Sequence, residues 1–163
     1  RRVRRGGSAV TISQRAPDGR WFGSAPDLLA DVRGPGVDPL IKRIEHAVVA
    51  YPYNKTYRIW PGPNSNTFTA FVLRHVPELR VDLPAHAVGK DYLGTRVFAR
   101  SLSGTGGQVN LFGVLGLVAG IEEGMELNLL GLTFGVDPND VALELPLVGT
   151  LGFGAPVTAS TLY

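Results

Sequence analysis

Residues 57–73 hold the side chains best placed to do chemistry, because a rigid turn there delivers a hydroxyl group onto the start of a predicted helix. The Pro-Gly-Pro sequence at 61–63 forces a bend, and the Asn64-Ser65-Asn66 run that follows it consists of good helix N-caps. The apolar residues beyond it recur at helical spacing: Phe68, Phe71, Val72 and Val76. The positive end of the helix dipole favours an ionised nucleophile or a bound anion. Ser65 is therefore a candidate nucleophile.

A catalytic serine needs a general base within about 3 Å, and a third group must orient that base. The chain has three histidines. His75 lies ten residues along the same predicted helix, about 15 Å from Ser65 at 1.5 Å per residue, and we expect it to be buried against Phe68 and Phe71. His46 falls off the apolar face of its own predicted helix. His86 is left as the candidate base, and either Asp82 or Asp91 would orient it.

The alternative is that Ser65 is only a helix N-cap, worth about 1 kcal/mol, while its neighbours bond to the turn. The Gly89-Lys90-Asp91-Tyr92 sequence either lines the same cleft as Ser65 or forms a local ion pair beside a half-buried aromatic ring. The candidate binding residues are Trp60, Asn64, Asn66, Lys90, Asp91 and Tyr92. Three glutamates near a predicted hairpin turn, Glu122, Glu123 and Glu126, are expected to be solvated, so we assign no metal and no cofactor.

Composition favours one domain. The 163 residues are 44% hydrophobic, enough for one continuous core, and the absence of cysteine excludes disulfides, thiolate metal sites and thiol catalysis. Residues 1–100 carry all 16 basic residues and 8 acidic ones, which gives a formal charge of +8. Residues 101–163 carry no basic residue and 6 acidic ones, which gives a charge of −6. The chain begins at Arg1 without a methionine, so we expect a removed leader or a missing upstream portion.

The basic residues concentrate in an N-terminal arm, residues 1–15, that begins with Arg1, Arg2, Arg4 and Arg5. Such an arm could contact acidic lipid or an acidic protein surface, although a solvated terminal arm is the simpler interpretation. Nucleic-acid binding is not expected, because Trp21 and Phe22 adjoin a turn and do not alternate with the arginines.

The first hundred residues predict two helices and several short strands. Helices are expected at 38–51, where Asp38 would be the N-cap and Pro52 ends the helix, and at 64–76. The 38–51 helix would bury Ile41, Ile44 and Val48. Strands are expected at 9–13, at 58–60 and at 97–102. A turn at 16–20 would connect the first of them to Trp21 and Phe22 as a hairpin. A loop should cover 83–93.

The rest of the chain predicts an antiparallel meander over 108–154. The apolar stretch 111–121 fits a buried strand better than a membrane helix, since about 20 residues are needed to span a bilayer. Residues 125–134 alternate as one strand with a bulge between Leu129 and Leu130. In that strand Leu130, Leu132 and Phe134 are expected to face the helices, and Gly131, Thr133 and Gly135 to form a smooth outer face. We therefore predict a single α+β domain over 16–155, with a tail at 156–163.

Several phrases resemble an uncharacterised bacterial family, domain of unknown function 3750, over roughly residues 16–155. They are Ala16 to Gly23, Trp-Pro-Gly-Pro-Asn-Ser-Asn-Thr-Phe at 60–68, Gly89 to Tyr92 and Leu127 to Leu132. The resemblance implies no established activity. Members of the family often carry more sequence upstream, with an apolar anchor and a histidine-containing strand. The Asn64-Ser65 helix start is also similar, more remotely, to permuted papain-like proteins of the NlpC and lecithin:retinol acyltransferase type. That similarity implies a papain-like scaffold with Ser65 at the thiol position.

These observations predict a non-catalytic binding or structural module of the bacterial cell envelope, membrane-associated or periplasmic. One alternative is a serine-dependent amidase or acyl hydrolase of an envelope substrate, and another is an accessory subunit docked on a membrane complex. We expect residues 101–163 to contain the interaction face for a protein partner or membrane surface, because they lack the positive charges that normally protect exposed sheet edges.

Overall fold

Seven consecutive strands form one antiparallel sheet, in the order β10-β9-β8-β7-β6-β5-β4. They are β4 (Phe98–Arg100), β5 (Gly107–Leu111), β6 (Leu115–Gly120), β7 (Gly124–Leu129), β8 (Leu132–Asp137), β9 (Ala142–Leu145) and β10 (Gly149–Gly152). The computed structural model describes residues 2–3, 8–12, 14, 19–20, 22–137, 142–145, 149–152 and 160–161. Within them the predicted meander and the single α+β domain are confirmed.

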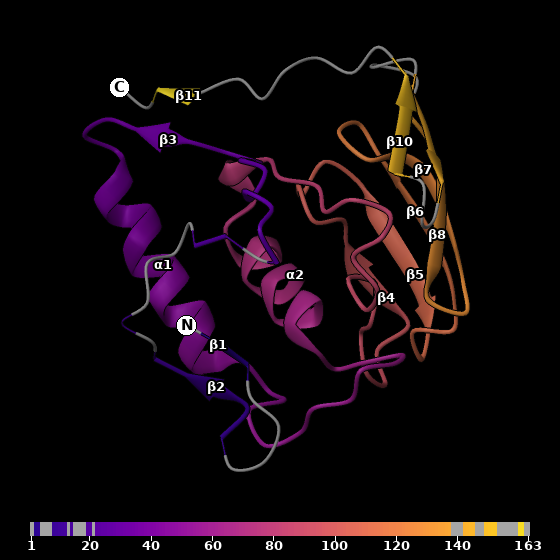
Figure 1. Ribbon diagram of the computed structural model, residues 1–163, viewed down its shortest axis with the longest axis horizontal. Coiled ribbons are helices and arrows are strands. Elements are labelled where there is room, and N and C mark those ends of the chain that lie inside the picture. The colour runs from indigo at the N-terminus through magenta and orange to yellow at the C-terminus, as the bar shows by residue number, and fades with distance from the viewer. Residues whose placement is uncertain are drawn as a thin grey trace.

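Three layers are visible in Figure 1: helix α1 (Val37–Ala50), then helix α2 (Ser65–His75), then the sheet. The short 3₁₀ helix η1 (Pro77–Leu79) follows α2. Two further pairs of short strands lie outside the main sheet: β1 (Arg2–Val3) with β2 (Val10–Thr11), and β3 (Val32–Arg33) with β11 (Ser160–Thr161). None of the described helices is long and apolar enough to cross a bilayer.

The helix boundaries correct two details of the sequence prediction. Helix α1 is capped by Gly36, and Asp38 lies inside its first turn without making a side-chain cap. Its buried residues are Leu40 and Ala47, whereas Ile41 is exposed, so the apolar face is rotated from the predicted one. As predicted, α1 ends before Pro52, and His46 is exposed. Helix α2 is capped by Asn64, which makes Ser65 its first residue.

Two strand predictions also need correction. Residues 58–60 form no strand; they lead into the Trp60–Pro61 and Gly62–Pro63 peptide bonds, both of which are cis. The partner of β2 is β1, and not a strand around Phe22. Ala16, Pro17, Asp18 and Trp21 of the expected turn and hairpin lie outside the described residues. The predicted strand at 97–102 is present as β4.

Two of the predicted strands are in fact hairpins. The stretch 111–121 turns at Phe112-Gly113, and 125–134 turns at Leu130-Gly131 between β7 and β8. All four turn residues have positive φ, between 54° and 83°. That conformation matches the right-handed twist of the flanking strands, and it normally selects Asn-Gly or Asp-Gly. The change of phase at Leu129–Leu130 is thus a two-residue turn and not a bulge.

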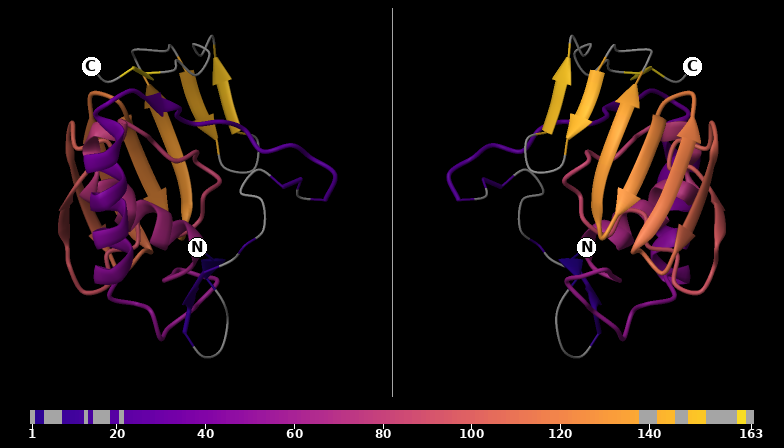
Figure 2. Two further views of the ribbon diagram at one scale, coloured as in Figure 1. Left: turned by 90° about the vertical axis from the view of Figure 1, so that its left-hand side faces the viewer. Right: turned by 90° about the vertical axis from the view of Figure 1, so that its right-hand side faces the viewer.

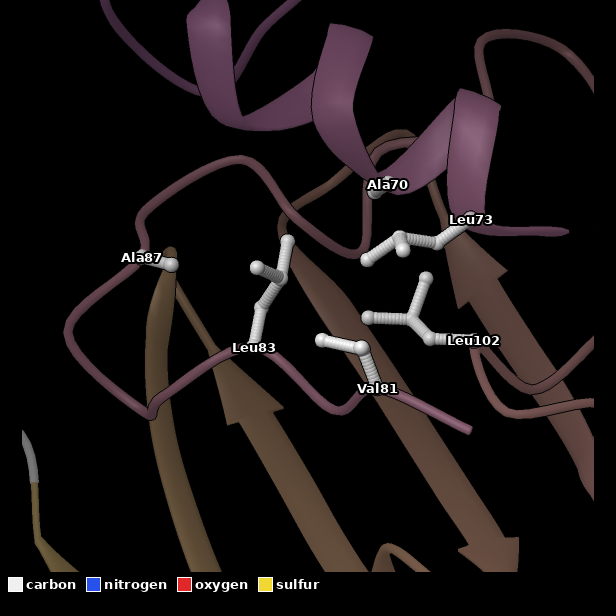
Figure 3. Close-up of a cluster of buried hydrophobic side chains, with 6 residues drawn as sticks. All are labelled: Ala70, Leu73, Val81, Leu83, Ala87 and Leu102. Atoms are coloured by element: carbon white, nitrogen blue, oxygen red, sulfur yellow. The ribbon is translucent and has the colours of Figure 1, made fainter. Parts of the chain in front are cut away.

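The hydrophobic core lies between α2 and the sheet and is built largely by the segment that connects them. Figure 3 shows Ala70 and Leu73 of α2 above Val81, Leu83 and Ala87 of that segment, with Leu102 after β4 beside them. An aromatic group on the other side of α2 joins the two helices. Tyr51, the C-cap of α1, lies with its ring centroid 5.0 Å from that of Phe68 and 5.4 Å from that of Phe71.

The sheet is polar on its inner face and apolar on its outer face. The buried inward residues include Gln108, Asn110, Glu126, Asn128 and Thr133. Most of the described outward hydrophobic side chains are exposed, and Leu145 is half-buried. The exposed ones are Phe98, Val109, Leu111, Leu115, Leu117, Met125, Leu127, Leu129, Leu132, Phe134, Val136, Leu143 and Leu151. Figure 2 (right) shows this face with no described element in front of it. The prediction that Leu132 and Phe134 face the helices is therefore wrong.

Candidate functional site

The Pro-Gly-Pro-Asn-Ser-Asn-Thr sequence clamps the start of α2 to the loop at 87–92. The Asn64 side chain accepts hydrogen bonds from the backbone N–H groups of Asn66 and Thr67, at 2.9 and 3.1 Å, and donates to the carbonyls of Ile59 and Val88. The Thr67 side chain accepts from Asn64 N–H and donates to Gly89 O at 2.8 Å. These contacts form a capping box, so the cap is Asn64 and not Ser65.

Gly89 makes this close approach possible. Its φ is +93°, and a Cβ atom added there would lie 2.5 Å from Asn64 Nδ2. Asn66 Nδ2 also donates to Val88 O, at 2.9 Å. The conspicuous residues of the motif are thus occupied by contacts that fix backbone, and the arrangement is structural.

Lys90 and Asp91 point into the sheet from this loop. Lys90 is 1% exposed and its Nζ donates to Glu126 Oε1 at 2.6 Å and to Leu83 O at 2.7 Å, with Asp82 Oδ1 at 3.6 Å. Burial lowers the pKa of Lys90, but the Asp82, Glu126 and Asp91 carboxylates more than offset this effect and raise it overall. Burial, together with Asp82 and Asp91, raises the pKa of Glu126, and Lys90 opposes that rise.

Asp91 is held by amide side chains of the inner face. Asn128 Nδ2 donates to Asp91 Oδ2 at 2.9 Å, and Gln108 Nε2 donates to Asp91 O at 2.9 Å and to Oδ1 at 3.2 Å. The ion-pair partners of Lys90 are therefore Glu126, at 2.6 Å, and Asp82, at 3.6 Å, and not Asp91. This network pairs buried Gln108, Glu126 and Asn128 of the inner face with the 82–91 loop. Buried Asn110 lies outside the network: its Oδ1 accepts from Gly113 N–H at 2.6 Å, and its Nδ2 has no partner among the described residues.

The predicted solvation of the three glutamates is wrong for two of them. Glu126 is buried in the network above, and buried Glu123 accepts a hydrogen bond from Ser103 N–H at 2.8 Å. Glu122 pairs with Arg80 at 3.4 Å. Within the described part of the chain, no three His, Asp or Glu side chains gather as a metal ion would require.

Ser65 and His86 are both exposed, one at the first position of α2 and the other in the 83–93 loop. No hydrogen bond joins Ser65 to a histidine among the residues that the structure describes. His75 is exposed and not buried as predicted: it stacks on Phe71 at 4.2 Å between ring centroids, and its Nδ1 lies 2.7 Å from Phe71 O. The continuous helix predicted from 65 to 75 is present.

Trp60 belongs to a different cluster, at one end of the sheet. Its Nε1 donates to Leu130 O at 2.7 Å, and Leu130 N–H donates to Val114 O at 2.6 Å, so the two hairpin turns and the Trp60 segment are tied together. A Cβ atom added to Gly131 would lie 2.8 Å from Trp60 Nε1. The side chains at the tips remain in solvent: Phe112 is 63% exposed, Leu130 62% and Trp60 50%.

The outer face and these tips make one continuous apolar surface. One row of residues paired across five strands is entirely apolar: Phe98, Val109, Leu117, Leu127 and Phe134. A second row, Leu111, Leu115, Leu129 and Leu132, runs beside the turns. Among the described outward positions, Arg100 at the β4 edge is the one charged residue. We call this surface, with Trp60, Phe112 and Leu130 at its end, the outer face.

The family model "Protein of unknown function (DUF3750)" matches residues 2–92. The chain belongs to this family. The matched region contains the Pro-Gly-Pro clamp, Lys90 and Asp91, and it ends before the sheet begins. The Leu127 to Leu132 phrase of the resemblance therefore lies outside it. No curated protein and no solved structure matches the chain.

Proposed function

We propose that this protein of the DUF3750 family is a non-catalytic binding module that docks on a lipid surface through its outer face. The observation that carries the proposal is the inverted sheet, which buries its polar side chains and exposes its apolar ones. Seven strands about 4.8 Å apart, with about three outward positions each, give a patch on the order of 500 Å². This is at the upper end of the apolar patches that monomeric proteins expose, and such patches are often functional.

The chemistry of the outer face fits lipid better than protein. Ordinary protein interfaces contain about one hydrogen bond per 100–200 Å², and this face offers hardly any side-chain donor or acceptor. Trp60 suits a membrane interface, because its ring is apolar while its N–H is already satisfied by Leu130 O. Exposed Arg100 lies at the β4 edge of the patch, and exposed Arg58 precedes Trp60 by two residues; basic side chains at the edge of such a patch meet lipid headgroups.

The turn residues add a second line of support. A non-glycine residue with positive φ is disfavoured by about 1–2 kcal/mol, and Asn would tolerate this conformation better than Phe or Leu. Phe112 and Leu130 each have φ 54° and expose most of their surface, so neither folding propensity nor core packing accounts for them. Insertion of their side chains into an apolar medium gives a reason for both.

The proposal keeps the envelope location expected from the resemblance. Docking on a membrane protein complex would use the same face, with apolar protein surface in place of lipid. The serine hydrolase finds less support, because exposed Ser65 has no histidine bonded to it in the described structure. Covalent labelling of Ser65 by a fluorophosphonate probe would favour the hydrolase over the binding module.

Co-sedimentation with phosphatidylcholine vesicles tests the proposal. We expect the protein to bind, and the Phe112→Asn/Leu130→Asn variant to bind about thirtyfold more weakly. Half-burial of two large apolar side chains contributes about 2 kcal/mol, and each 1.4 kcal/mol is about tenfold in affinity.

The matched control is Leu28→Asn/Val49→Asn, which removes two equally exposed apolar side chains away from the outer face. It should bind as the wild type does. Equal losses in the two variants would mean non-specific adsorption. A stable dimer in sedimentation velocity, without vesicle binding, would assign the outer face to a second copy and overturn the proposal.

A further inference from the structure

A cleft of about 220 Å³ lies at the β4 edge of the sheet, on the side of the helices. Helix α2 contributes Phe71 and Arg74, the loop after Tyr92 contributes Arg96, and β4 contributes Arg100. Tyr53 and Tyr92 complete its aromatic wall. These residues play no part in the outer-face proposal except Arg100, which lies where the cleft and the outer face meet.

The cleft is strongly basic. Three arginines are among its lining residues, and none of the lining residues is acidic. The side chains of Arg96 and Arg100 are exposed, and neither makes a hydrogen bond or ion pair in the part of the chain that the structure describes. Elsewhere Arg33, Arg43 and Arg80 are each paired with a carboxylate. Arg96 and Arg100 therefore bring positive charge to the cleft that no described carboxylate pairs with.

Arg74 is the fixed member of the three. Its Nε donates to Arg100 O at 3.2 Å, and its Nη2 donates to Lys90 O at 3.3 Å and to Gln108 Oε1. Its Nη1 makes no hydrogen bond with the described residues, so two N–H donors remain for a ligand. Burial, together with the charge of Arg96, lowers the pKa of Arg74 to about 10, although Asp91 and Glu123 act in the opposite direction. A bound anion would relieve this unfavourable environment.

The remaining walls are aromatic. The rings of Tyr53 and Tyr92 pack edge to face at 5.7 Å between centroids. Phe71 lies one helix turn before Arg74, on the same face of α2, and the His75 ring packs on it at 4.2 Å between centroids. Such walls contact a flat or apolar group. Guanidinium groups bind tetrahedral oxyanions through paired N–H donors, and three of them match a dianion better than a monoanion.

We propose that this cleft binds a phosphate monoester whose phosphate meets Arg74, Arg96 and Arg100 and whose organic part packs on Tyr53, Phe71 and Tyr92. Phosphate monoesters occur both as soluble metabolites and as the headgroup of phosphatidic acid. The shared chemistry is the dianionic phosphate, and the two sources are separated by experiment.

Phenyl phosphate is the soluble probe, titrated into the protein by isothermal calorimetry with benzyl alcohol as the uncharged comparison. We expect saturable binding of one phenyl phosphate and none of benzyl alcohol. Arg96→Gln/Arg100→Gln should weaken binding by at least tenfold, because each charge-assisted hydrogen bond is about twice as strong as a neutral one. Both residues are exposed, so the fold should tolerate the change.

The control for lost charge is Arg20→Gln/Lys42→Gln, which removes two exposed positive charges outside the cleft. It should bind phenyl phosphate as tightly as the wild type. An equal loss in the control would mean long-range attraction without a site, and would overturn the proposal.

The lipid arm compares phosphatidylcholine vesicles with and without phosphatidic acid, in the Phe112→Asn/Leu130→Asn background that weakens outer-face docking. Binding that requires phosphatidic acid and is lost in Arg96→Gln/Arg100→Gln identifies the lipid headgroup as the source. Binding of phenyl phosphate alone identifies a soluble source. If neither probe shows arginine-dependent binding, the proposal is wrong, whatever the outcome for the outer face.

Discussion

At the scale of single residues, the most prominent sequence motif is an internal clamp. Asn64 is buried and makes bonds to residues before it, after it and in the 87–92 loop. Ser65 beside it is exposed and its hydroxyl contributes no cap. The sequence predicted a capped helix start correctly but chose the wrong cap, because all three residues of Asn64-Ser65-Asn66 are good caps and spacing alone does not rank them.

The two neighbours should differ sharply in their effect on stability. We expect Asn64→Ala to lower the free energy of unfolding by about 2–4 kcal/mol, because it removes the cap and the part-buried hydrogen bonds to the carbonyls of Ile59 and Val88. Ser65→Ala should change it by less than about 0.5 kcal/mol. Urea denaturation of both variants measures this, and a larger loss for Ser65→Ala would restore Ser65 as the cap.

The sequence singled out residues that the structure places in the clamp and in the buried network, but it did not predict their partners. Asn64 and Val88 are 24 residues apart, and Lys90 and Glu126 are 36 apart, so their pairing depends on the folded chain. The one sequence signal of the clamp is Gly89 in the Gly-Lys-Asp-Tyr phrase, because the backbone there has a positive φ that glycine adopts most easily. The cleft lined by Arg74, Arg96 and Arg100 has no sequence signal, because these residues come from a helix, a loop and a strand that only the folded chain brings together.

At the scale of elements, the sequence predicted the two helices and the meander and missed two turns. Helix spacing and proline placed α1 and α2 within about two residues of their observed ends. The turns were missed because Phe112-Gly113 and Leu130-Gly131 lack the Asn or Asp that marks such hairpins. Phe112 and Leu130, the first residues of these turns, adopt positive φ less readily than Asn would. Their exposed side chains therefore call for a reason other than folding.

Replacing these turn residues should therefore not harm the fold. We expect Phe112→Asn and Leu130→Asn each to leave the free energy of unfolding unchanged or to raise it by about 0.5–1 kcal/mol, because Asn adopts positive φ more readily. Thermal or urea denaturation checks this.

Gly131→Ala is the contrasting variant. It should destabilise the protein, since φ is +83° there and the added Cβ would meet Trp60 Nε1 at 2.8 Å. If Phe112→Asn or Leu130→Asn instead lost more than about 1 kcal/mol, the side chain would be part of the packing that holds the fold, and its role as a docking tip would lose support.

At the scale of the whole molecule, the sheet is inverted, and this is what the sequence could not predict. Alternation correctly grouped Leu132 with Phe134 and Thr133 with Gly135. It could not say which group faces the helices, and the usual rule that apolar side chains lie inside gave the wrong answer. The rule fails because the 82–91 loop supplies the charged side chains of Lys90 and Asp91, which pair with Glu126, Gln108 and Asn128 of the polar face. The papain-like scaffold suggested by the remote similarity stays a prediction.

The most direct test of the account is the depth of Trp60 in a bilayer. In a Trp21→Phe variant, Trp60 is the one tryptophan, and brominated phosphatidylcholine quenches tryptophan that enters the acyl region. We predict that the emission of Trp60 shifts to shorter wavelength on vesicle binding and is quenched by lipids brominated near the interface. A reporter on α1, Val49→Trp with Trp60→Phe in the same background, should remain unquenched. Unshifted Trp60 emission at millimolar lipid, or equal quenching of both reporters, would contradict docking through the outer face.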